Sequence, residues 1–390
     1  MHGIIWNMLG VVLLVLSLPG TVELLLLTVF GLLPLRKTKS AAARPLKIAV
    51  IIPAHDEELH IEKAIKSLLS CDPVKQILTV VVTADNCSDR TAALAGKAGA
   101  CVLERNDLKN RGKGPALNFA FRHLEKERYD AFIVIDADTV VERNFIAEFN
   151  RFFQAGAEAV QCRYLVANPD VSPRTRLMDL ALQSMHVLRP RGRSRMSVSC
   201  GIFGNGFGLT RDTLEAVPYL ADSIVEDLEY HIALVQAGKK VHFINGTTVR
   251  AEFPAGGKGM DTQRSRWEGG RLRVALDKSP LLLKEIMKGN FRLIEPLLEL
   301  LTLPLAYHVL LLTATLIIPV LFIRIYAIAA FGIVMIHILT AIIIGGEVRG
   351  LFTLLFVPFY IIWKISRLSG ILKTSNKKAS WKRTTRKEGG

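Results

Sequence analysis

Ala131-Phe132-Ile133-Val134-Ile135-Asp136-Ala137-Asp138 is the stretch of sequence that decides the fold. Its five apolar residues have the length and composition of a buried strand. Two carboxylates follow at once, and carboxylates that share a site raise one another's pKa unless a cation removes the repulsion. Mg²⁺ or Mn²⁺ binds one or two carboxylates and completes its shell with phosphate oxygens. Asp136 and Asp138 therefore predict a divalent metal with a diphosphate at a strand end.

Strand-like and helix-like patterns alternate on both sides of this stretch. Val/Ile-rich runs predict further strands at 48–53, 77–83 and 101–104, and helices are expected over 57–69, 89–97 and 113–125. Buried runs of this kind separated by helices are typical of parallel sheets covered on both faces. We therefore expect an α/β domain over residues 44–280, with a mixed, mostly parallel sheet.

Acidic residues follow three of these strands. Pro53-Ala54-His55-Asp56-Glu57-Glu58 comes after the first, Ala84-Asp85-Asn86-Cys87-Ser88-Asp89 comes after the second, and Asp136 follows the strand at 131–135. Ligands of such sheets bind beyond the carboxyl ends of the strands. A single acid there is often only a helix cap, a reading that stays open for Asp89. Three together favour one shared site.

Two common nucleotide-binding loops are absent from the sequence. There is no G-x-x-x-x-G-K-[ST] loop, and no G-x-G-x-x-G follows the first strand. These absences argue against a P-loop nucleotidase and a dinucleotide oxidoreductase. Gly204-Asn205-Gly206-Phe207-Gly208 either lines a pocket where backbone approaches a ligand or forms a turn before residues 209–214.

Glu226 and Asp227 open a predicted helix that runs to about Ala237 and ends at Gly238. The helix dipole favours an ionised Asp227 in the first turn, where the carboxylate can accept a proton from a hydroxyl group. The alternative is a plain acidic first turn.

Gln263, Arg266 and Trp267 share one face of a predicted helix by their i, i+3 and i+4 spacing. Arginine can clamp a diphosphate, and tryptophan offers a flat surface to a sugar ring. The alternative is a basic amphipathic helix on a membrane surface.

The apolar residues, 50% of the chain, concentrate at its two ends. Residues 3–35 predict one tilted or kinked membrane span within a segment 1–36. Arg36, Lys37 and Lys39 follow the span, which argues against a cleaved signal peptide and places the next domain in the cytoplasm. Glu23 within the span faces either protein or the headgroup layer.

The C-terminal third predicts more membrane segments. We expect interfacial amphipathic helices over 281–304, two spans within 305–345 (305–323 and 325–345), an interfacial or re-entrant helix over 349–368, and a basic cytoplasmic tail at 371–390. Residues 364–390 hold nine Lys or Arg against one Glu, which suits anionic lipid. This layout predicts a multi-pass protein of the inner or plasma membrane.

Other features narrow the function. The net charge of +15 comes with no nucleic-acid signature, so we expect no nucleic-acid partner. Five cysteines without a C-x-x-C pair indicate free thiols in a reducing compartment. Arg189, Arg191, Arg193 and Arg195 alternate in a Pro/Gly-containing stretch, which predicts either contact with anionic headgroups or an acidic acceptor, or a solvated basic loop.

Asp85, Asp136-x-Asp138, Glu226-Asp227 and Gln263-x-x-Arg266-Trp267, in this order, resemble the family 2 membrane glycosyltransferases of GT-A fold. That group includes cellulose, chitin, hyaluronan and poly-N-acetylglucosamine synthases and ceramide-glucosyltransferase-like enzymes. The resemblance covers about residues 45–280 and the flanking membrane layout. It implies an inverting, metal-dependent transfer from a UDP-sugar.

The resemblance also implies roles for single residues. Asp227 would be the catalytic base and Asp138 the metal ligand. The donor would lie against Pro53, His55, Glu57, Asp85, Lys113 and Asp136. The acceptor and diphosphate would lie against Glu226, Gln263, Arg266 and Trp267.

Three functional hypotheses follow. The first is transfer to a growing polysaccharide or other glycan at the cytoplasmic membrane face. The second is addition of a single sugar to a membrane lipid, and the third is a non-catalytic nucleotide-sugar-binding subunit. The few predicted spans are a departure from chain-extruding synthases, so a polymer pore would need a membrane partner or a homo-oligomer.

Overall fold

The structure is a computed structural model, and it describes residues 2–35, 45–73, 77–220, 225–254, 258–346 and 350–365. Contacts divide these residues into two compact units. The sheet unit comprises Leu35–Val171 and Val198–Gln263, and the helical unit comprises Met1–Pro34, Ser172–Ser197 and residues from Arg264 onward. Ser172–Ser197, which lies inside the predicted domain 44–280, belongs to the helical unit by its contacts, and the predicted domain boundaries stay a prediction.

The sheet unit is built on one eight-stranded sheet in the order β3-β2-β1-β4-β7-β6-β8-β5. Its strands are β1 (Lys47–Ala54), β2 (Ile77–Asp85), β3 (Cys101–Arg105), β4 (Ala131–Val134), β5 (Thr139–Val141), β6 (Ala159–Val166), β7 (Phe207–Thr210) and β8 (Val241–Ala251). The first four are mutually parallel, and β6 is parallel to β8. Three antiparallel pairings complete the described sheet, so the predicted mixed sheet is confirmed.

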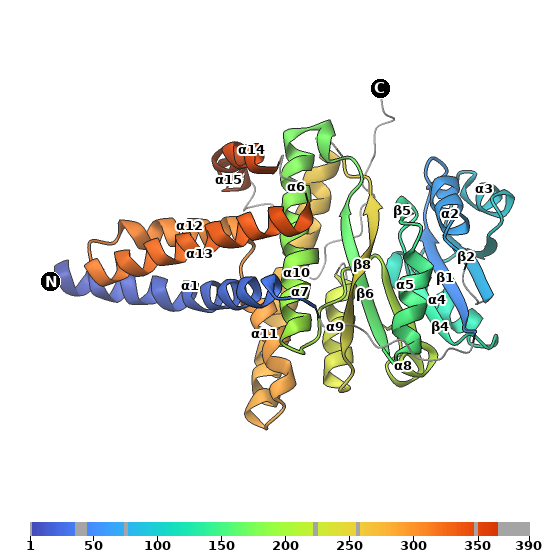
Figure 1. Cartoon of the computed structure of the whole chain (residues 1–390), viewed down its shortest axis with the longest axis horizontal. Coiled ribbons are helices and arrows are strands. Elements are labelled where there is room, and N and C mark those ends of the chain that lie inside the picture. The colour runs from blue at the N-terminus through green and yellow to red at the C-terminus, as the bar shows by residue number, and fades with distance from the viewer. Residues whose placement is uncertain are drawn as a thin grey trace. The chain divides into compact units, whose positions relative to one another are not determined.

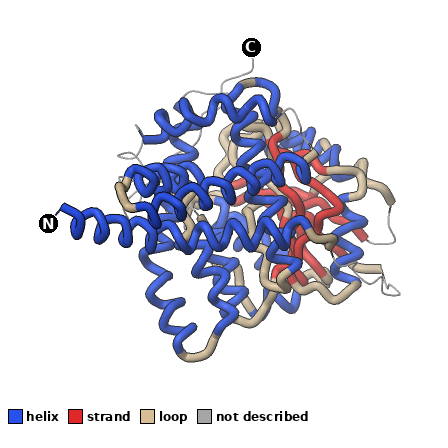
Figure 2. The backbone as a smooth tube through the Cα atoms, turned by 60° about the vertical axis from the view of Figure 1, so that its left-hand side comes forward, coloured by secondary structure: helices blue, strands red, loops and turns tan. Residues whose placement is uncertain are grey.

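The helices of the sheet unit agree with the predicted alternation. They are α2 (Ile61–Leu69), α3 (Thr91–Lys97), α4 (Lys113–Leu124), α5 (Phe145–Gln154), α8 (Arg211–Ala216) and α9 (Glu226–Gln236). α4 packs on β1 and β2, and α5 packs on β8. Figures 1 and 2 show the strands surrounded by these helices. α2 begins four residues later than expected, because a turn at Asp56, with φ 52°, precedes it.

The sheet core combines strand and helix side chains. Phe132, Phe207 and Tyr219 are almost fully buried, and the rings of Phe207 and Tyr219 stack. Fully buried strand residues of this kind explain the near-continuous apolar runs in the sequence. The core ends where the polar residues after the strands begin, and that edge carries the site described below.

The helical unit contains two helices that are long and apolar enough to cross a membrane. The candidate spans are Gly3–Leu32 in α1 (His2–Leu32) and the whole of α13 (Leu321–Gly345). The bent pair formed by residues 291–301 and α12 (Leu305–Ile317) would be a third if it acts as one span. α1 lies beside α12 and α13 in Figure 1, and the three helices are in contact. At 13 residues, α12 falls short of the expected span 305–323.

An internal segment completes this unit. α6 (Pro173–Gln183), a π-helical turn (Ser184–Leu188) and α7 (Arg189–Arg195) run on without a break. α7 packs closely on α1, since a Cβ added at Gly192 would lie 2.5 Å from the carbonyl oxygen of Leu27. The hypothesis of a solvated basic loop over Arg189–Arg195 is therefore wrong: the stretch is helical, and Arg193 is 2% exposed.

The buried Arg193 guanidinium forms ion pairs with a group of acidic side chains. Its guanidinium pairs with Glu23 at 3.2 Å, with Glu295, and with Glu299 at 3.7 Å. Glu23 also accepts a hydrogen bond from Thr302. Of the two predicted environments for Glu23, the structure shows the protein interior, and Arg193 pairs with carboxylates of its own chain.

The remaining described helices are one long helix and several short ones. They are α10 (Lys258–Met287), η1 (Pro169–Val171), η3 (Phe291–Leu293), α11 (Ile294–Leu301), α14 (Gly350–Thr353), η4 (Leu354–Phe356) and α15 (Val357–Ile365). No described helix over 350–365 reaches spanning length, and the interfacial or re-entrant character expected for 349–368 stays a prediction. Arg36, Lys37, Lys39 and the tail 371–390 lie outside the described residues.

Candidate active site

The strand register brings the predicted site residues to one edge of the sheet. Ala54 at the end of β1 pairs with Ala84 of β2, and Ile51 pairs with Val134 of β4. Asp85 therefore lies one residue beyond the Ala54–Ala84 pair. The register of β1 and β4, continued by two residues, places Asp136 beside Pro53. The predicted donor loop after β1 and two of the predicted acids accordingly share the carboxyl edge of the parallel strands.

Lys113 joins this edge to the second half of the sheet unit. Its ammonium donates hydrogen bonds to Asp136 and, at 2.6 Å, to the carbonyl oxygen of Gly204. Burial lowers the pKa of Lys113, but three neighbouring carboxylates outweigh burial and raise that pKa; they are Asp136, Glu226 and Asp227. Lys113 therefore stays charged among the predicted donor and base residues.

Two buried amide side chains hold the loop that meets Lys113. Asn205 accepts the backbone N–H of Asp136 at 3.1 Å and donates to Thr139 at 2.8 Å. Gln161 donates to the carbonyl oxygen of Asn205 at 2.8 Å and accepts the N–H of Phe203. Both side chains are fully buried. Hydrogen bonds of these two amides therefore hold the loop before β7 in place. The sequence predicted no role for either side chain.

Glu226 and Asp227 stand at the start of α9, as expected. A Cβ added at Gly204 would lie 3.2 Å from Oδ2 of Asp227 and 3.7 Å from Nζ of Lys113, which places both groups against the same loop residue. Burial raises the pKa of Glu226 to about 8, repulsion from Asp227 adds to the rise, and Lys113 opposes it. Glu226 therefore keeps its proton near neutral pH.

Asp85 lies in a buried ion-pair network. Arg105 donates to Asp85 at 2.6 Å and to Asp107 at 3.0 Å, and Asn86 also donates to Asp85. His55 Nδ1 lies 2.7 Å from the carbonyl oxygen of Asp85. Arg105 was not singled out from the sequence; it ends β3, one residue beyond the strand predicted over 101–104. The network fixes the Asp85 carboxylate at the predicted donor edge.

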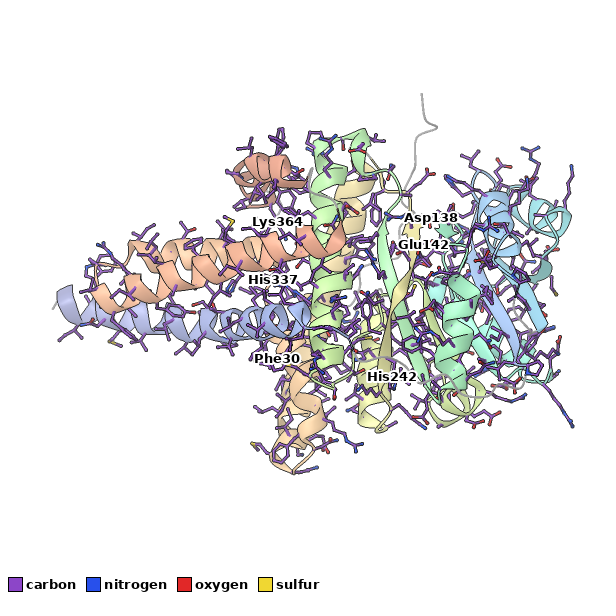
Figure 3. The ribbon with its side chains drawn as sticks, viewed as in Figure 1. Phe30, Asp138, Glu142, His242, His337 and Lys364 are labelled. Atoms are coloured by element: carbon purple, nitrogen blue, oxygen red, sulfur yellow. The ribbon has the colours of Figure 1, made fainter. Side chains whose placement is uncertain are left out.

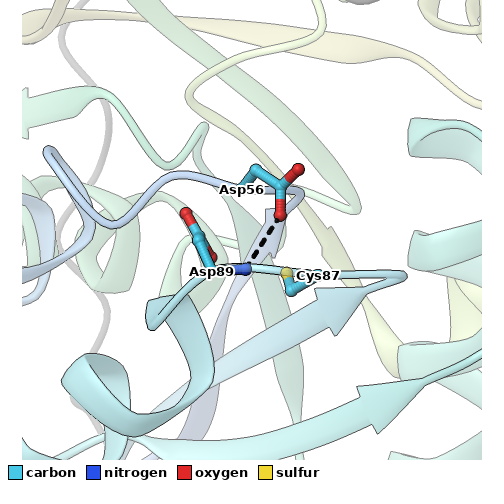
Figure 4. Close-up of side chains that lie close together, drawn as sticks. All are labelled: Asp56, Cys87 and Asp89. Carbon is cyan, nitrogen blue, oxygen red and sulfur yellow. Dashed lines mark hydrogen bonds between the residues drawn. The ribbon is translucent and has the colours of Figure 1, made fainter.

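Carboxylates and a cysteine also meet at the turn after β2, where Asp56, Cys87 and Asp89 lie together (Figure 4). Asp56 accepts N–H bonds from Ser88 at 2.7 Å and Asp89 at 3.3 Å. Asp89 in turn accepts hydrogen bonds from Thr91 and from the backbone of Glu58. These carboxylates therefore accept hydrogen bonds within the turns. Asp89 is not the N-cap of α3, which is Arg90, but it accepts the N–H of the first helical residue, Thr91.

The side chains around Lys113 are of the kind that bind a divalent cation. Three carboxyl groups lie near this one ammonium, and oxygen ligands are those that Mg²⁺ and Mn²⁺ prefer. Asp138, the predicted metal ligand, is partly exposed in the turn between β4 and β5 (Figure 3). It lies outside the Asp56–Cys87–Asp89 group, and its role as a ligand stays a prediction.

The last predicted motif lies on α10. Gln263 and Arg266 are helical, and their side chains lie outside the described part of the chain. Trp267 is 39% exposed, and the next residue, Glu268, is held by Lys364 at 2.9 Å and by Tyr307 at 3.1 Å. The roles of Gln263, Arg266 and Trp267 stay predictions, as do those of Pro53 and Glu57.

Comparison with known proteins identifies similar sequences. The family model described as "Glycosyltransferase like family 2" matches residues 45–270, more than half of the chain. "Probable glycosyltransferase YdaM" of Bacillus subtilis is 26% identical over 239 residues, which cover 59% of this chain and 56% of that protein. "Beta-monoglucosyldiacylglycerol synthase" of Synechocystis sp. is 28% identical over 243 residues, covering 59% and 49%. The chain spans about half the length of the curated relatives it matches.

A solved structure shares the fold. The mannosyltransferase PcManGT from Pyrobaculum calidifontis, in complex with GDP-Man and Mn²⁺, aligns with a TM-score of 0.55 at 16% identity. The alignment covers 95% of this chain and 96% of that chain. The predicted α/β fold of GT-A type is therefore confirmed.

Proposed function

The chain belongs to the glycosyltransferase-like family 2, and from this membership we propose that it transfers one sugar from a nucleoside diphosphate donor to a lipid acceptor. The observation that carries the proposal is the Lys113 site, in which an ammonium bonds Asp136 and Gly204 while Asp227 faces the same loop. The Lys113 ammonium can stabilise a diphosphate leaving group, and the neighbouring Asp227 carboxylate can act as a base.

The sequence leaves two acceptors open, a growing polysaccharide and a membrane lipid. We favour the lipid because of the names of two similar proteins. The relatives from Synechocystis and Nostoc are both named beta-monoglucosyldiacylglycerol synthase. Two helices of this chain have the length and apolarity to cross a membrane, which would bring a lipid acceptor within the same molecule's reach. We place the sheet unit on the cytoplasmic side, following the basic residues after the first span.

In the proposed reaction, Asp227 accepts the proton of the acceptor hydroxyl as its oxygen attacks the anomeric carbon. The bond to the donor phosphate breaks on the opposite face, so the configuration inverts. Lys113 stabilises the negative charge that grows on the departing diphosphate. A divalent cation held by Asp138 and Asp136 would neutralise further charge on that diphosphate.

Radiolabelled donors test the proposal. The full-length chain in detergent is incubated with Mn²⁺, dioleoylglycerol and a panel of UDP- and GDP-sugars, and label is followed into organic and ethanol-insoluble fractions. We expect one discrete glycolipid with one donor, lost in Asp227→Asn. A ladder or an insoluble polymer would favour the polysaccharide hypothesis, and label transfer that survives Asp227→Asn would contradict the assigned base.

A further inference from the structure

Glu268 on α10 belongs to a buried contact that joins three helices of the helical unit. Its carboxylate pairs with the ammonium of Lys364 on α15 at 2.9 Å and accepts a hydrogen bond from the Tyr307 hydroxyl of α12 at 3.1 Å. The Lys364 ammonium also lies 4.2 Å from the centre of the Tyr307 ring, which adds a cation–π contact. Only 14% of the Glu268 side chain and 5% of the Lys364 side chain are exposed. We call these three residues the α10 clamp.

Other contacts join the same helices to the rest of the helical unit. Arg271, three residues after Glu268 and on the same face of α10, donates to the carbonyl oxygen of Glu299 and, at 3.4 Å, to that of Thr302. On α15, the ring next to Lys364 lies against α6, since the guanidinium of Arg174 is 5.3 Å from the centre of the Trp363 ring. These contacts would keep α10 and α15 attached to the unit if the clamp were removed.

The clamp fixes a direction more than it adds stability. Burial of an ion pair gives little net stability, because the desolvation of two charges offsets their attraction. The ammonium and the hydroxyl nevertheless bond the Glu268 carboxylate directionally, so that it is held in one place. Successive residues of an α-helix are about 100° apart, so a fixed Glu268 also fixes the direction of its neighbour Trp267. Trp267 is 39% exposed, and the clamp therefore controls the rotation of α10 that presents this ring.

We propose that Glu268 is a positioning residue: the α10 clamp holds Trp267, a predicted acceptor residue, in the orientation that binds the acceptor. This inference rests on the proposed function. Tyr307 and Lys364 lie beyond residues 45–270, which the family model matches. The clamp therefore ties a motif of the family to helices of this chain that lie outside the family model.

The fluorescence of Trp267 tests the clamp without any sugar donor. The chain has four tryptophans, and replacement of Trp6, Trp363 and Trp381 by Phe leaves Trp267 as the only one. Quenching of its fluorescence by acrylamide is measured on this full-length parent in detergent. The quenching constant reports how far the quencher reaches the Trp267 ring, whether or not the chain transfers sugar.

We expect Glu268→Gln and Lys364→Met each to raise this quenching constant about twofold, since each leaves a buried charge unpaired and loosens this turn of α10. The double variant should be quenched no more than the stronger single variant, because both changes break the same contact. Quenching equal to that of the parent in both single variants would overturn the proposal. So would effects of the two changes that add in the double variant.

The matched control is Arg273→Met in the same parent. Arg273 lies on the same helix and pairs with Asp277 at 3.7 Å, but both side chains are more than a third exposed. Because an exposed pair of this kind holds the helix only weakly, the quenching constant should stay at its parent value. A rise as large as that of the clamp variants would contradict a specific role of Glu268.

Sugar transfer separates this inference from the proposed function. In the radiolabelled assay, Glu268→Gln should raise the KM for the lipid acceptor about tenfold and leave kcat within about twofold of the wild type, since an acceptor contact is weakened and Asp227 is untouched. Absence of transfer by the wild type would refute the proposed function, and the quenching results would still decide the clamp. Normal transfer by the wild type with an unchanged acceptor KM in Glu268→Gln would overturn the positioning role alone.

Discussion

Alanine at position 204 tests the geometry that joins Lys113 to Asp227. Gly204 has φ +76°, and a Cβ there would lie 3.2 Å from Oδ2 of Asp227. A left-handed conformation costs a non-glycine residue about 1–2 kcal/mol. The new contact forces Asp227 or the loop to move by a few tenths of an ångström. Because a 1 Å misplacement can cost about 10²-fold in rate, we expect kcat to fall by roughly tenfold or more.

Gly156→Ala is the matched control for this variant. Gly156 has φ +87°, and a Cβ there would meet no atom of the described chain within 4 Å. Both variants should lose about 1–2 kcal/mol of unfolding free energy, measured by thermal unfolding in detergent. Only Gly204→Ala should slow sugar transfer in the radiolabelled assay. Equal kcat in the two variants would refute the inference that residue 204 contacts a catalytic Asp227.

Three further predictions follow from the same contacts. Asp227→Asn should lower kcat by about 10²–10⁴-fold while calorimetry shows nearly unchanged donor binding, and a small kcat effect would exclude it as the base. Because the folded pKa of Glu226, about 8, exceeds its ordinary value of 4.5, the folded chain holds a proton that the unfolded chain releases between these values. The unfolding free energy without metal should therefore fall as pH rises through this window, and Glu226→Gln should flatten the pH dependence of the melting temperature. Arg193→Met leaves buried carboxylates unpaired and should cost about 3–5 kcal/mol of unfolding free energy. Arg143→Met, at an exposed pair with Asp72, should cost under about 1 kcal/mol, and similar losses would contradict the burial argument.

The first half of the sheet could be predicted from the sequence because most residues of β1, β2 and β4 are buried. Such strands appear as short Val/Ile runs, so the predictions at 48–53, 77–83, 101–104 and 131–135 agree with β1 to β4 within two residues at each end. The antiparallel half was not predicted strand by strand. Its strands pair across long separations, as β4 does with β7, and local patterns do not encode such pairings.

The site shows the same limit. Acids after strands were recognisable, because the register of parallel strands brings their carboxyl ends together. The supporting groups were not recognisable, since Gln161 and Arg105 act through contacts with residues 20 or more positions away. Arg193 was misjudged for a related reason. Its partners come from two distant segments, Glu23 from α1 and Glu295 and Glu299 from α11, and a basic stretch with glycine and proline is locally typical of a loop.

Calorimetry of UDP and GDP binding, with and without Mn²⁺, tests the central claim most directly. The claim is that Lys113 and the acids around it form one site for a diphosphate and a divalent cation. We predict that Mn²⁺ tightens binding of one of the two nucleotides by at least about tenfold in the wild type, and that Asp138→Asn abolishes this effect. Lys113→Met should weaken binding with or without the metal. A nucleotide affinity that is unchanged by Mn²⁺ and by Lys113→Met would contradict the claim.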